Sequence, residues 1–371
     1  MFKPAWFANL QAPLTWAAGP DLCSGLFTGQ YFMSKAENQR WLNAQGRVPL
    51  MHGPTPLEPM DRLSEELGGP RIWLKRDDCT GLATGGNKTR KLEFLMAEAI
   101  EQNADTVVTY GAVQSNHARQ TAAACAKLGL SCHLVLSERV RWPHPSYVRQ
   151  GNVQLDKLFG AHLHICPVDD VATQRARLLQ RFADAGRQVF EIPAGGSSLR
   201  GALGYSQCLQ ELVSQCDTQG IAHDMIVHAS ASAGTQAGLV FGRSLLDVDC
   251  HILGINVFHP DPQTLKDRVH KLAEDMFNAW PAVTALQPLQ IDVNHAYLGD
   301  GYGLPTQACI EAITMAAQLE GVLFDPVYSG KALAAMNDQI NLGNFSHLND
   351  VVLVHTGGSA SLSAYVDAFE A

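Results

Sequence analysis

Short apolar runs rich in β-branched residues alternate with amphipathic stretches of helical period from Arg71 onward. The apolar runs predict strands at residues 106–110, 132–136, 162–166, 188–192, 224–228, 251–257 and 351–355. The stretches between them predict helices that include residues 91–102, 117–128 and 173–185. Because strands that alternate with helices are typical of open, twisted parallel sheets with helices on both faces, we expect an α/β fold.

Residues 1–46 have no clear period and contain several Gly and Pro residues, which predicts an N-terminal extension that caps or wraps the folded part. Residues 5–18 look like a signal peptide, but Asn9, Gln11 and Pro13 interrupt the apolar run, so we expect no secretion. No stretch reaches the roughly 20 apolar residues that cross a bilayer, so we expect no membrane partner. The length of 371 residues suits two domains with buried cores.

Gly-rich bends follow several of the predicted strands. They lie at residues 85–86, 195–196, 234 and 357–358. In open α/β sheets the ligand crevice lies outside the carboxyl ends of the strands. We therefore expect these bends to converge on one site.

The segment Gly-Leu-Ala-Thr-Gly-Gly-Asn-Lys-Thr at 81–89 puts Lys88 in a glycine-rich bend between a strand and a helix. Such a backbone brings the amine close to a planar cofactor, where it can form a Schiff base with an aldehyde. A phosphate-binding P-loop needs Gly and Lys adjacent before Ser or Thr, but Asn87 separates them here. A tight turn with a solvated lysine is the alternative that this segment alone leaves open.

The segment Gln-Ser-Asn-His-Ala-Arg at 114–119 follows the first predicted strand and opens the helix after it. On the simpler interpretation, Ser115 or Asn116 is an ordinary N-cap. The backbone N–H groups at a helix start also suit a carboxylate, such as that of an amino-acid substrate. We expect His117 to be a first-turn residue.

The run Ala-Ser-Ala-Ser-Ala-Gly-Thr-Gln-Ala-Gly at 229–238 follows the predicted strand 224–228 and leads into a helix. Small side chains let the backbone close around a phosphate, and the hydroxyls of Ser232 and Thr235 add donors. Close packing of a helix on a strand is the alternative, but the run holds more small residues than packing requires. We therefore favour a phosphate cup.

Tyr302 and Tyr328 lie beside Gly and Pro bends, in Gly-Asp-Gly-Tyr-Gly-Leu-Pro at 299–305 and Asp-Pro-Val-Tyr-Ser-Gly-Lys at 325–331. Either ring can stack on a flat cofactor or donate its phenol proton to a reacting group. A half-buried core tyrosine is the alternative at each position.

Histidine and cysteine usage predicts neither a metal centre nor disulfides. His162, His164 and Cys166 share one face of a predicted strand, but no fourth ligand follows at a familiar spacing, so we expect no metal. The nine cysteines are scattered, odd in number and never spaced as Cys-x-x-Cys, which fits reduced thiols in a cytoplasm.

The composition is that of a soluble acidic protein, with 46% hydrophobic residues, 17% charged residues and a formal net charge of -9. This charge repels a polyanion, and no Lys/Arg-rich run offers a local exception. We therefore expect a small-molecule substrate and no nucleic-acid partner.

Six segments in a fixed order carry a family resemblance. They are Gly-Gly-Asn-Lys-Thr-Arg-Lys-Leu-Glu-Phe at 85–94, Gln-Ser-Asn-His at 114–117, Ser-Ala-Gly-Thr-Gln-Ala-Gly at 232–238, Gly-Tyr-Gly-Leu-Pro at 301–305, Asp-Pro-Val-Tyr-Ser-Gly-Lys at 325–331 and His-Thr-Gly-Gly at 355–358. Together they resemble the pyridoxal-phosphate (PLP) enzymes of the tryptophan-synthase β fold, called fold type II. The similar branch holds D-cysteine desulfhydrase, L-cysteate sulfo-lyase and aminocyclopropane-carboxylate (ACC) deaminase.

The resemblance implies a larger domain of residues 47–90 plus 195–371 and a smaller inserted domain of residues 91–194. PLP would lie in the cleft between them, in a cytoplasmic homodimer. Lys88 would hold PLP covalently and move the α-proton of the substrate. Asn116 would hydrogen-bond the ring hydroxyl.

The remaining site residues also follow from the resemblance. The phosphate would be held by Ser232, Ala233, Gly234 and Thr235. The substrate carboxylate would be bound by Ser115, Asn116 and His117, with Ser115 near enough for proton transfer. Tyr302 and Tyr328 would flank the substrate.

Ser329 decides which reaction the resemblance implies. In the deaminase, the residue after the tyrosine of Asp-Pro-Val-Tyr is a glutamate that meets the pyridine nitrogen. A hydroxyl in its place donates to a neutral ring, which is a poorer electron sink. Such a ring is sufficient when a good leaving group departs from Cβ, whereas opening a cyclopropane demands more.

We therefore expect α,β-elimination of a sulfur group from a 3-substituted alanine, with D-cysteine giving pyruvate, ammonia and sulfide. L-cysteate, giving sulfite, is the alternative substrate. ACC deamination and a non-catalytic PLP-binding role are the remaining alternatives.

Overall fold

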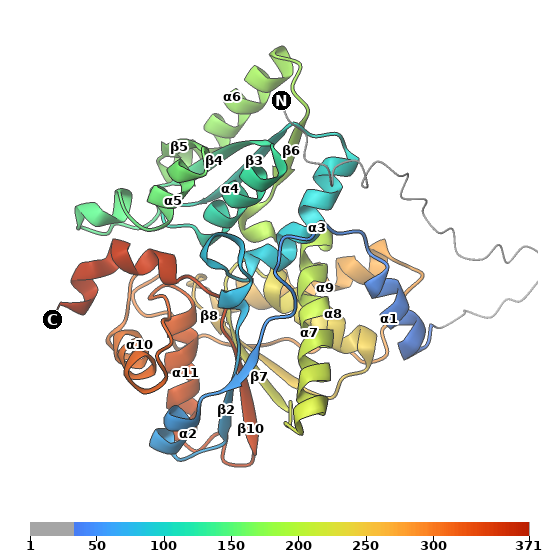
Figure 1. Ribbon diagram of the computed structural model, residues 1–371, viewed down its shortest axis with the longest axis vertical. Helices are drawn as coiled ribbons and strands as arrows, with labels where there is room; N and C mark the ends of the chain where they lie inside the picture. Colours follow the sequence, from blue (N-terminus) through green and yellow to red (C-terminus); the bar gives the residue numbers. More distant parts are fainter. Residues whose placement is uncertain (1–32, 371) are drawn as a thin grey trace, which may run out of the picture. The chain divides into compact units, whose positions relative to one another are not determined.

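Two β-sheets organise residues 33–370, the part of the chain that this computed structural model describes (Figure 1). The larger sheet has the order β1–β2–β10–β7–β8–β9, and the smaller has the order β5–β4–β3–β6. The larger sheet consists of β1 (Leu57–Pro59), β2 (Arg71–Lys75), β7 (Met225–Ser230), β8 (His251–Asn256), β9 (Asp292–Asn294) and β10 (Asp350–Val354). The smaller consists of β3 (Thr106–Ala112), β4 (Ser131–Ser137), β5 (His162–Cys166) and β6 (Val189–Ile192).

Parallel pairing dominates both sheets, and only β1 runs antiparallel to its neighbour among the described strands. The predicted strands are β3 to β8 and β10, each within two residues of its expected bounds. The pattern did not predict β1, β2 or β9, and β1 and β9 have only three residues each. The predicted α/β class with parallel sheets is confirmed.

Helices cover both faces of each sheet. They are α1 (Lys35–Asn43), α2 (Asp61–Leu67), α3 (Lys88–Glu101), α4 (Asn116–Leu128), α5 (Asn152–Leu158), α6 (Val171–Asp184), α7 (Leu199–Gln219), α8 (Gly234–Leu246), α9 (Pro262–Ala279), α10 (Gln307–Glu320) and α11 (Ser329–Asn341). The three predicted helices are α3, α4 and α6. On the larger sheet, α2, α10 and α11 pack on one face and α7 and α8 on the other. On the smaller sheet, α3 and α4 lie opposite α6.

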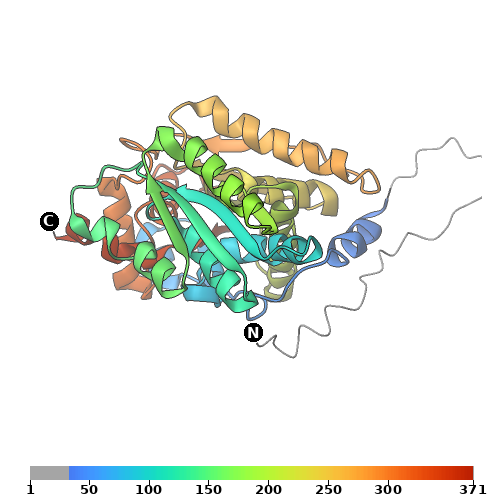
Figure 2. The same ribbon diagram turned by 90° about the horizontal axis from the view of Figure 1, so that it is seen from above.

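Helix α1 belongs to the folded part, although the pattern predicted only an extension over residues 1–46, of which 1–32 lie outside the described residues. Ser34 and Glu37 form a reciprocal capping box, which starts this helix. The buried Asn38 donates through Nδ2 to the carbonyl oxygens of Leu245 at 2.8 Å and Thr284 at 3.0 Å. These contacts hold α1 against α8 and against the segment that follows α9 (Figure 2).

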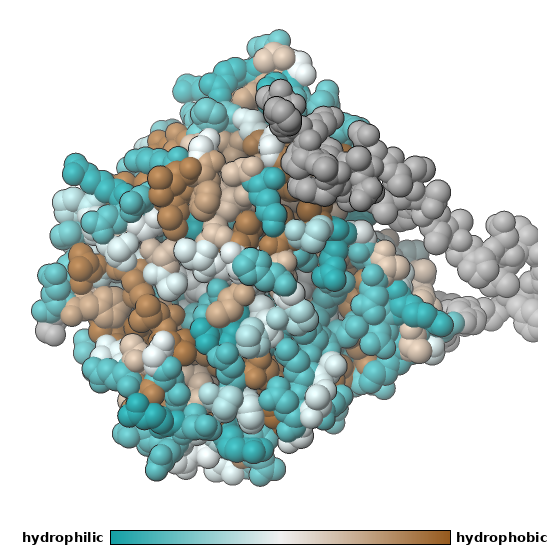
Figure 3. All heavy atoms as spheres, viewed as in Figure 1, coloured by the Kyte–Doolittle hydropathy of each residue, from teal (hydrophilic) through white to brown (hydrophobic). Residues whose placement is uncertain are grey.

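Hydrophilic residues cover most of the face in Figure 3, with apolar patches over its left half. Within residues 33–370, no helix combines the length and the apolar character that a membrane span requires. Among residues 33–370, the most exposed large apolar residues are Leu158, Leu342 and Leu323, which are 73%, 64% and 54% exposed.

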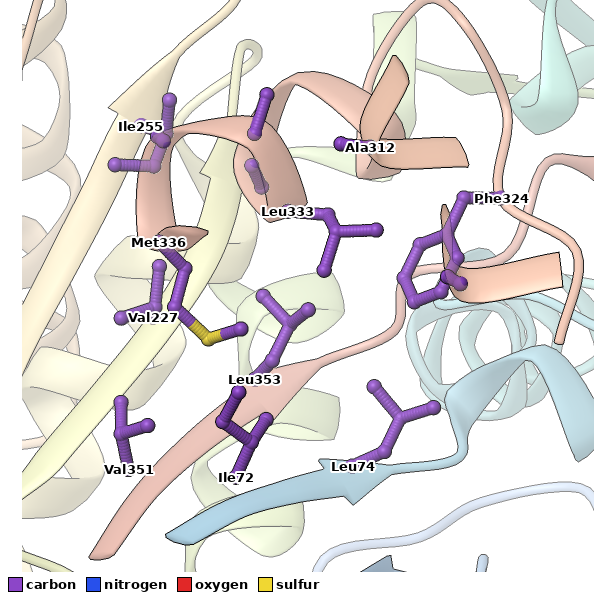
Figure 4. Packing of buried hydrophobic residues seen from close by; sticks show 14 of the residues in the cluster. Ile72, Leu74, Val227, Ile255, Ala312, Phe324, Leu333, Met336, Val351 and Leu353 are labelled. Carbon is purple, nitrogen blue, oxygen red and sulfur yellow. The ribbon is translucent and has the colours of Figure 1, made fainter. Parts of the chain in front are cut away.

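The core beneath the larger sheet fixes the strands whose ends carry the functional loops. Ile72, Val227 and Leu353 lie on the adjoining strands β2, β7 and β10 and are at most 1% exposed. They pack against Leu333 and Met336 of α11 (Figure 4). Truncation of such side chains to Ala costs about 2–5 kcal/mol each. The strand ends are therefore held by dense packing rather than by the loops themselves.

Candidate active site

A cavity of about 800 Å³ lies where the carboxyl ends of strands from both sheets meet. The smaller sheet contributes the ends of β3 and β4, and the larger contributes the segments after β7, β8 and β10. Lining residues include Asn87, Lys88, Ser115, Asn116, His117, Ser197, Ser232, Ala233, Thr235, Tyr302, Tyr328 and Thr356. The structure therefore brings together every site residue expected from the sequence except Gly234 and Ser329, which do not line the cavity.

The loop before Lys88 depends on two glycines. Gly85 and Gly86 have φ angles of 74° and 127°, which side chains rarely allow. A Cβ on Gly85 would lie 1.6 Å from the carbonyl oxygen of Asp78. Only glycine fits there, and the loop then delivers Lys88 as the first residue of α3.

A buried ion-pair network holds α3 in place behind Lys88. Arg90 donates to both carboxylate oxygens of Asp77, each at 2.8 Å, and the Tyr205 hydroxyl donates to the same group at 2.6 Å. Burial alone would raise the pKa of Asp77, but the charge of Arg90 keeps it below its usual value. Glu211 accepts the remaining Arg90 donors at 2.9 and 3.0 Å. The helix that carries Lys88 is therefore anchored by a fully paired charge cluster.

Two lysine amines lie close together on α3, and Lys88 is the one that lines the cavity. Burial lowers the pKa of Lys88 to about 8. Lys91 lies three residues further along α3, is fully buried, and donates from Nζ to the carbonyl oxygen of Gly195 at 3.2 Å. Burial and the neighbouring Lys88 charge lower the pKa of Lys91 well below its usual value. A Lys88 amine that loses its proton near pH 8 is available as a nucleophile or base.

The start of α4 forms the opposite wall. Ser115 caps the helix, because its Oγ accepts from the backbone N–H of Ala118 at 3.1 Å. His117 is buried, and its Nε2 lies 2.8 Å from Oγ1 of Thr109. Burial and the nearby lysines lower the pKa of His117, so the ring is neutral. The helix start therefore offers backbone N–H groups, rather than an imidazolium, to a carboxylate.

The predicted phosphate cup opens α8. Ala233 is its N-cap residue and has a φ of 72°, a strained value for a residue with a side chain. Gly234 is the first residue of the helix, and a Cβ there would lie 2.9 Å from Lys91 Nζ. The backbone at the start of α8 is therefore closely approached by Ser197 and by a buried amine, and a side chain on Gly234 would not fit between them.

The bend at residues 195–198 closes this cup, and its two glycines belong to the Gly-rich bends that the sequence predicted to converge on the site. Ser197 accepts from the backbone N–H of Gly234 at 3.1 Å and donates to Ser232 Oγ at 2.8 Å. A Cβ on Gly195 would lie 2.2 Å from Ser232 Oγ, so this bend also requires glycine. Ser197 was not assigned to the cup from the sequence, although the Gly-Gly-Ser-Ser sequence after β6 was a signal that could have revealed this residue.

Tyr302 and Tyr328 are hydrogen-bonded through their hydroxyls at the cavity wall. Burial raises the pKa of Tyr302 to about 12 and that of Tyr328 further still. Both phenols are therefore protonated near neutral pH. One of the two hydroxyl protons remains available to a third group.

Ser329 does not occupy the place expected for it. Its Oγ donates to Asp325 Oδ1 at 2.6 Å and accepts from the Asp325 N–H at 3.0 Å, so its own turn uses the hydroxyl. Thr356, in the His-Thr-Gly-Gly segment, lines the cavity instead. Both residues were visible in the sequence. The position of Ser329 directly after Tyr328 did not show, however, that its side chain points away from the cavity.

His162, His164 and Cys166, weighed as metal ligands, do not form such a site. Among residues 33–370, no group of three or more His, Cys, Asp or Glu side chains is arranged to hold a metal ion. The rings of His162 and His164 stack instead on His133, at 4.5 and 5.4 Å between centroids.

Comparison with known proteins identifies the family. The family model described as "Pyridoxal-phosphate dependent enzyme" matches residues 48–357. The chain belongs to this family. The predicted resemblance and the predicted cofactor are thereby confirmed for this pyridoxal-phosphate dependent enzyme.

Individual relatives narrow the likeness further. D-cysteine desulfhydrases of Serratia proteamaculans (strain 568) and Salmonella typhi are each 41% identical to the chain over 320 residues, 86% of this chain and 96% of theirs. The solved structure of an ACC deaminase homologue has a TM-score of 0.79 and 32% identity, and the match covers 90% of this chain and 98% of that one. Maize serine racemase, at a TM-score of 0.63 and 17% identity over 91% of this chain and 97% of its own, shares the fold.

The cavity of this pyridoxal-phosphate dependent enzyme fits its cofactor. Ser232, Ala233 and Thr235 line the cavity with small side chains, and a Cβ on Gly234 or on Gly195 would collide with Ser197 or Ser232. The N-terminus of this 13-residue helix attracts an anion, and the Lys91 amine lies beside it. Lys88, with its lowered pKa, supplies the amine that an aldehyde requires.

Proposed function

We propose that this enzyme eliminates the thiol group of D-cysteine, so that D-cysteine and water give pyruvate, ammonia and sulfide. The observation that carries the proposal is the amine of Lys88, of lowered pKa, at a cavity wall opposite the anion-binding start of α4. The two D-cysteine desulfhydrases at 41% identity support the choice of substrate. In the test, purified enzyme and D-cysteine should release pyruvate and sulfide in equal amounts. Absence of turnover with any 3-substituted alanine would instead favour a non-catalytic PLP-binding protein.

Bound PLP supplies an electron-withdrawing ring system that makes the proton on the substrate Cα acidic. Lys88 would hold the cofactor through Nζ, and its amine would accept the Cα proton of the bound substrate. The pKa of about 8 suits this exchange, because the amine both accepts and releases protons near neutral pH. The anchored helix α3 keeps Nζ in place for both tasks.

Ser115, Asn116 and His117 bind the substrate carboxylate at the start of α4. Their backbone N–H groups and the positive end of the helix dipole favour an anion there. This contact orients Cα toward Lys88. Ser115 Oγ lies at the same wall and accepts only one backbone hydrogen bond, so its own proton is available for transfer.

Tyr302 and Tyr328 act on the leaving sulfur. Both phenols keep their protons near neutral pH because of burial, so the pair donates a hydrogen bond to the sulfide as the Cβ–S bond breaks. The catalytic set proposed is therefore Lys88, Ser115, Tyr302 and Tyr328.

The cofactor contacts follow the cavity lining. Ser232, Ala233 and Thr235, which line the cavity, hold the phosphate together with Gly234, the first residue of α8, and the Lys91 amine lies beside Gly234. Asn116 donates to the ring oxygen. Thr356 takes the ring-nitrogen contact that the sequence assigned to Ser329, because Ser329 Oγ is engaged with Asp325.

L-cysteate is the second candidate substrate, and Arg139 is the observation that favours it. This guanidinium lines the cavity and lies 5.4 Å from the centre of the Phe258 ring, without an ion pair to a carboxylate of residues 33–370. Phe258 in turn packs on Tyr302, at 4.7 Å between ring centres. A sulfonate on Cβ would meet this positive charge beside the tyrosine pair. If L-cysteate is the substrate, Arg139→Leu should raise its KM about tenfold and leave that for D-cysteine unchanged.

We further propose a cytoplasmic homodimer, as the family resemblance implies. The free thiols of all described cysteines support a reducing compartment. Light scattering of the purified chain should give about twice its mass of 40.2 kDa, and a value near 40.2 kDa would contradict the dimer.

A further inference from the structure

The side-chain amides of Asn116 and Asn152 form a direct hydrogen bond in the wall behind the cavity. Asn152 is the first residue of α5, is fully buried and does not line the cavity. Its Nδ2 lies 2.9 Å from Oδ1 of Asn116. An amide has one accepting end and one donating end, so the orientation of one side chain decides that of the next.

Arg119 decides the orientation of the first amide. Its Nε lies 3.0 Å from Oδ1 of Asn152. Since a guanidinium only donates, Asn152 must present its oxygen to Arg119 and its Nδ2 elsewhere. That Nδ2 meets Asn116 Oδ1 and, at 3.3 Å, the carbonyl oxygen of Gln114.

The orientation of the Asn152 amide in turn determines that of the Asn116 amide. Because its Oδ1 accepts from Asn152, its Nδ2 is the end left for the cavity that Asn116 lines. Arg119 is itself fixed, since it donates to the carbonyl oxygen of Gly85 at 2.9 Å and to Thr84 Oγ1 at 2.8 Å in the loop before Lys88. A donor-only group thus sets the direction of two consecutive amides.

We propose that Asn152 is a positioning residue that, held by Arg119, turns Asn116 so that its Nδ2 donates to the ring oxygen of the cofactor. This inference rests on the proposed function, which gives Asn116 that contact. Asn152 touches neither substrate nor cofactor and acts only through the amide of Asn116.

The sharpest variant is Asn152→Asp, which preserves shape. A carboxylate still accepts from Arg119, but it offers Asn116 only an acceptor. Asn116 must then turn its Nδ2 toward position 152 and its Oδ1 toward the cavity, where it opposes the ring oxygen. Asn152→Ala removes the donor without adding charge and serves if Asn152→Asp does not fold.

The control is Asn38→Asp. Asn38 is equally buried and also donates through Nδ2 to two oxygens, but it lies in α1, away from the cavity. It reports what the loss of buried donors does to the protein in general.

The readout is the affinity of the full-length protein, freed of cofactor and reconstituted, for PLP and for 3-deoxypyridoxal 5′-phosphate, which lacks the ring hydroxyl. The ratio of the two affinities isolates the hydroxyl contact, because other effects of each substitution act on both probes. The ratio of the affinity for PLP to that for the 3-deoxy compound should be about tenfold higher in the wild type and in Asn38→Asp than in either Asn152 variant. A tenfold factor is the effect expected of one charge-assisted hydrogen bond. Asn116→Ala should lose the same factor, and Asn116→Ala/Asn152→Asp no more than Asn116→Ala alone.

A wild-type ratio in both Asn152 variants, with a reduced ratio in Asn116→Ala, overturns the positioning role and leaves the proposed function intact. A wild-type ratio in Asn116→Ala removes the ring contact and the positioning role together. A wild-type protein that binds neither probe overturns the proposed function itself.

Discussion

Arg90 and Arg119 are both buried arginines on helices that reach the cavity. They differ in how many of their hydrogen-bond donors, and of the neighbouring carboxylate oxygens, have a partner. Arg90 donates to Asp77, Glu211 and Thr55, and burial does not prevent a pKa well above the usual value. Arg119 leaves Nη2 without a partner among the described residues. Both carboxylate oxygens of its neighbour Asp156 also lack one.

The pKa values follow this difference. Burial raises the pKa of Asp156 to about 8, and burial lowers that of Arg119 to about 10. The Arg90 cluster is thus a paired charge network that holds α3, whereas Arg119 is a positioning group kept at a cost in stability. The buried charges around Arg90 hold α3 rigidly, whereas the buried charge of Arg119 orients the amide of Asn152.

Breaking the paired network should have the largest effect. Arg90→Met leaves Asp77 buried without its countercharge, and we expect a loss of about 3–5 kcal/mol in the free energy of unfolding. Urea denaturation of the full chain measures it. Arg187→Met, at the half-exposed ion pair with Asp105, is the control and should cost less than about 1 kcal/mol. Equal losses in the two variants would remove the distinction between the clusters.

Replacing Asp156, the carboxyl without a hydrogen-bond partner, should raise the free energy of unfolding rather than lower it. Folded Asp156 keeps its proton up to a pKa of about 8, whereas the unfolded carboxyl loses its proton near its ordinary pKa of 3.8. Stability therefore falls as pH rises through this window, because the folded state binds more protons there. Asp156→Asn should remove the fall, with a gain of a few kcal/mol at pH 9 and of less than about 1 kcal/mol at pH 4. A gain that is independent of pH would contradict the assignment.

Trimming the paired network should have the smallest effect. Tyr205→Phe removes one hydrogen bond to Asp77 while both Arg90 bonds remain, so we expect a loss of about 1 kcal/mol. Thermal unfolding measures this, and the absorbance of bound PLP should be unchanged. A loss as large as that of Arg90→Met would make Tyr205, rather than the arginine, the main partner of Asp77.

The hydrophobic period predicted the parallel sheets because buried strands are continuous apolar runs in the sequence. It did not predict β1 and β9, which are too short to show a period, or α1, whose signal was the capping box of Ser34 and Glu37. Lys91 was also overlooked, although residues three apart on a helix share a face, and Lys88 was already a candidate.

Site residues were predictable where the backbone itself makes the site, as at the glycine loop and the start of α8. Side chains whose direction is set by their hydrogen-bond partners were not. Ser329 is turned away by Asp325 four residues earlier, and Asn152 reaches Asn116 across 36 positions of the chain. The direction of a side-chain hydrogen bond depends on the folded arrangement. The spacing of residues in the sequence therefore does little to predict it.

The central claim is that Lys88 Nζ carries the cofactor. Borohydride reduction of the yellow full-length enzyme, followed by peptide mapping, tests it directly, because Lys91 lies only three residues away on the same buried face. We predict the label on Lys88 alone and a colourless Lys88→Ala variant. A label on Lys91 or on any other residue, or a Lys88→Ala protein that remains yellow and reducible, would contradict the account.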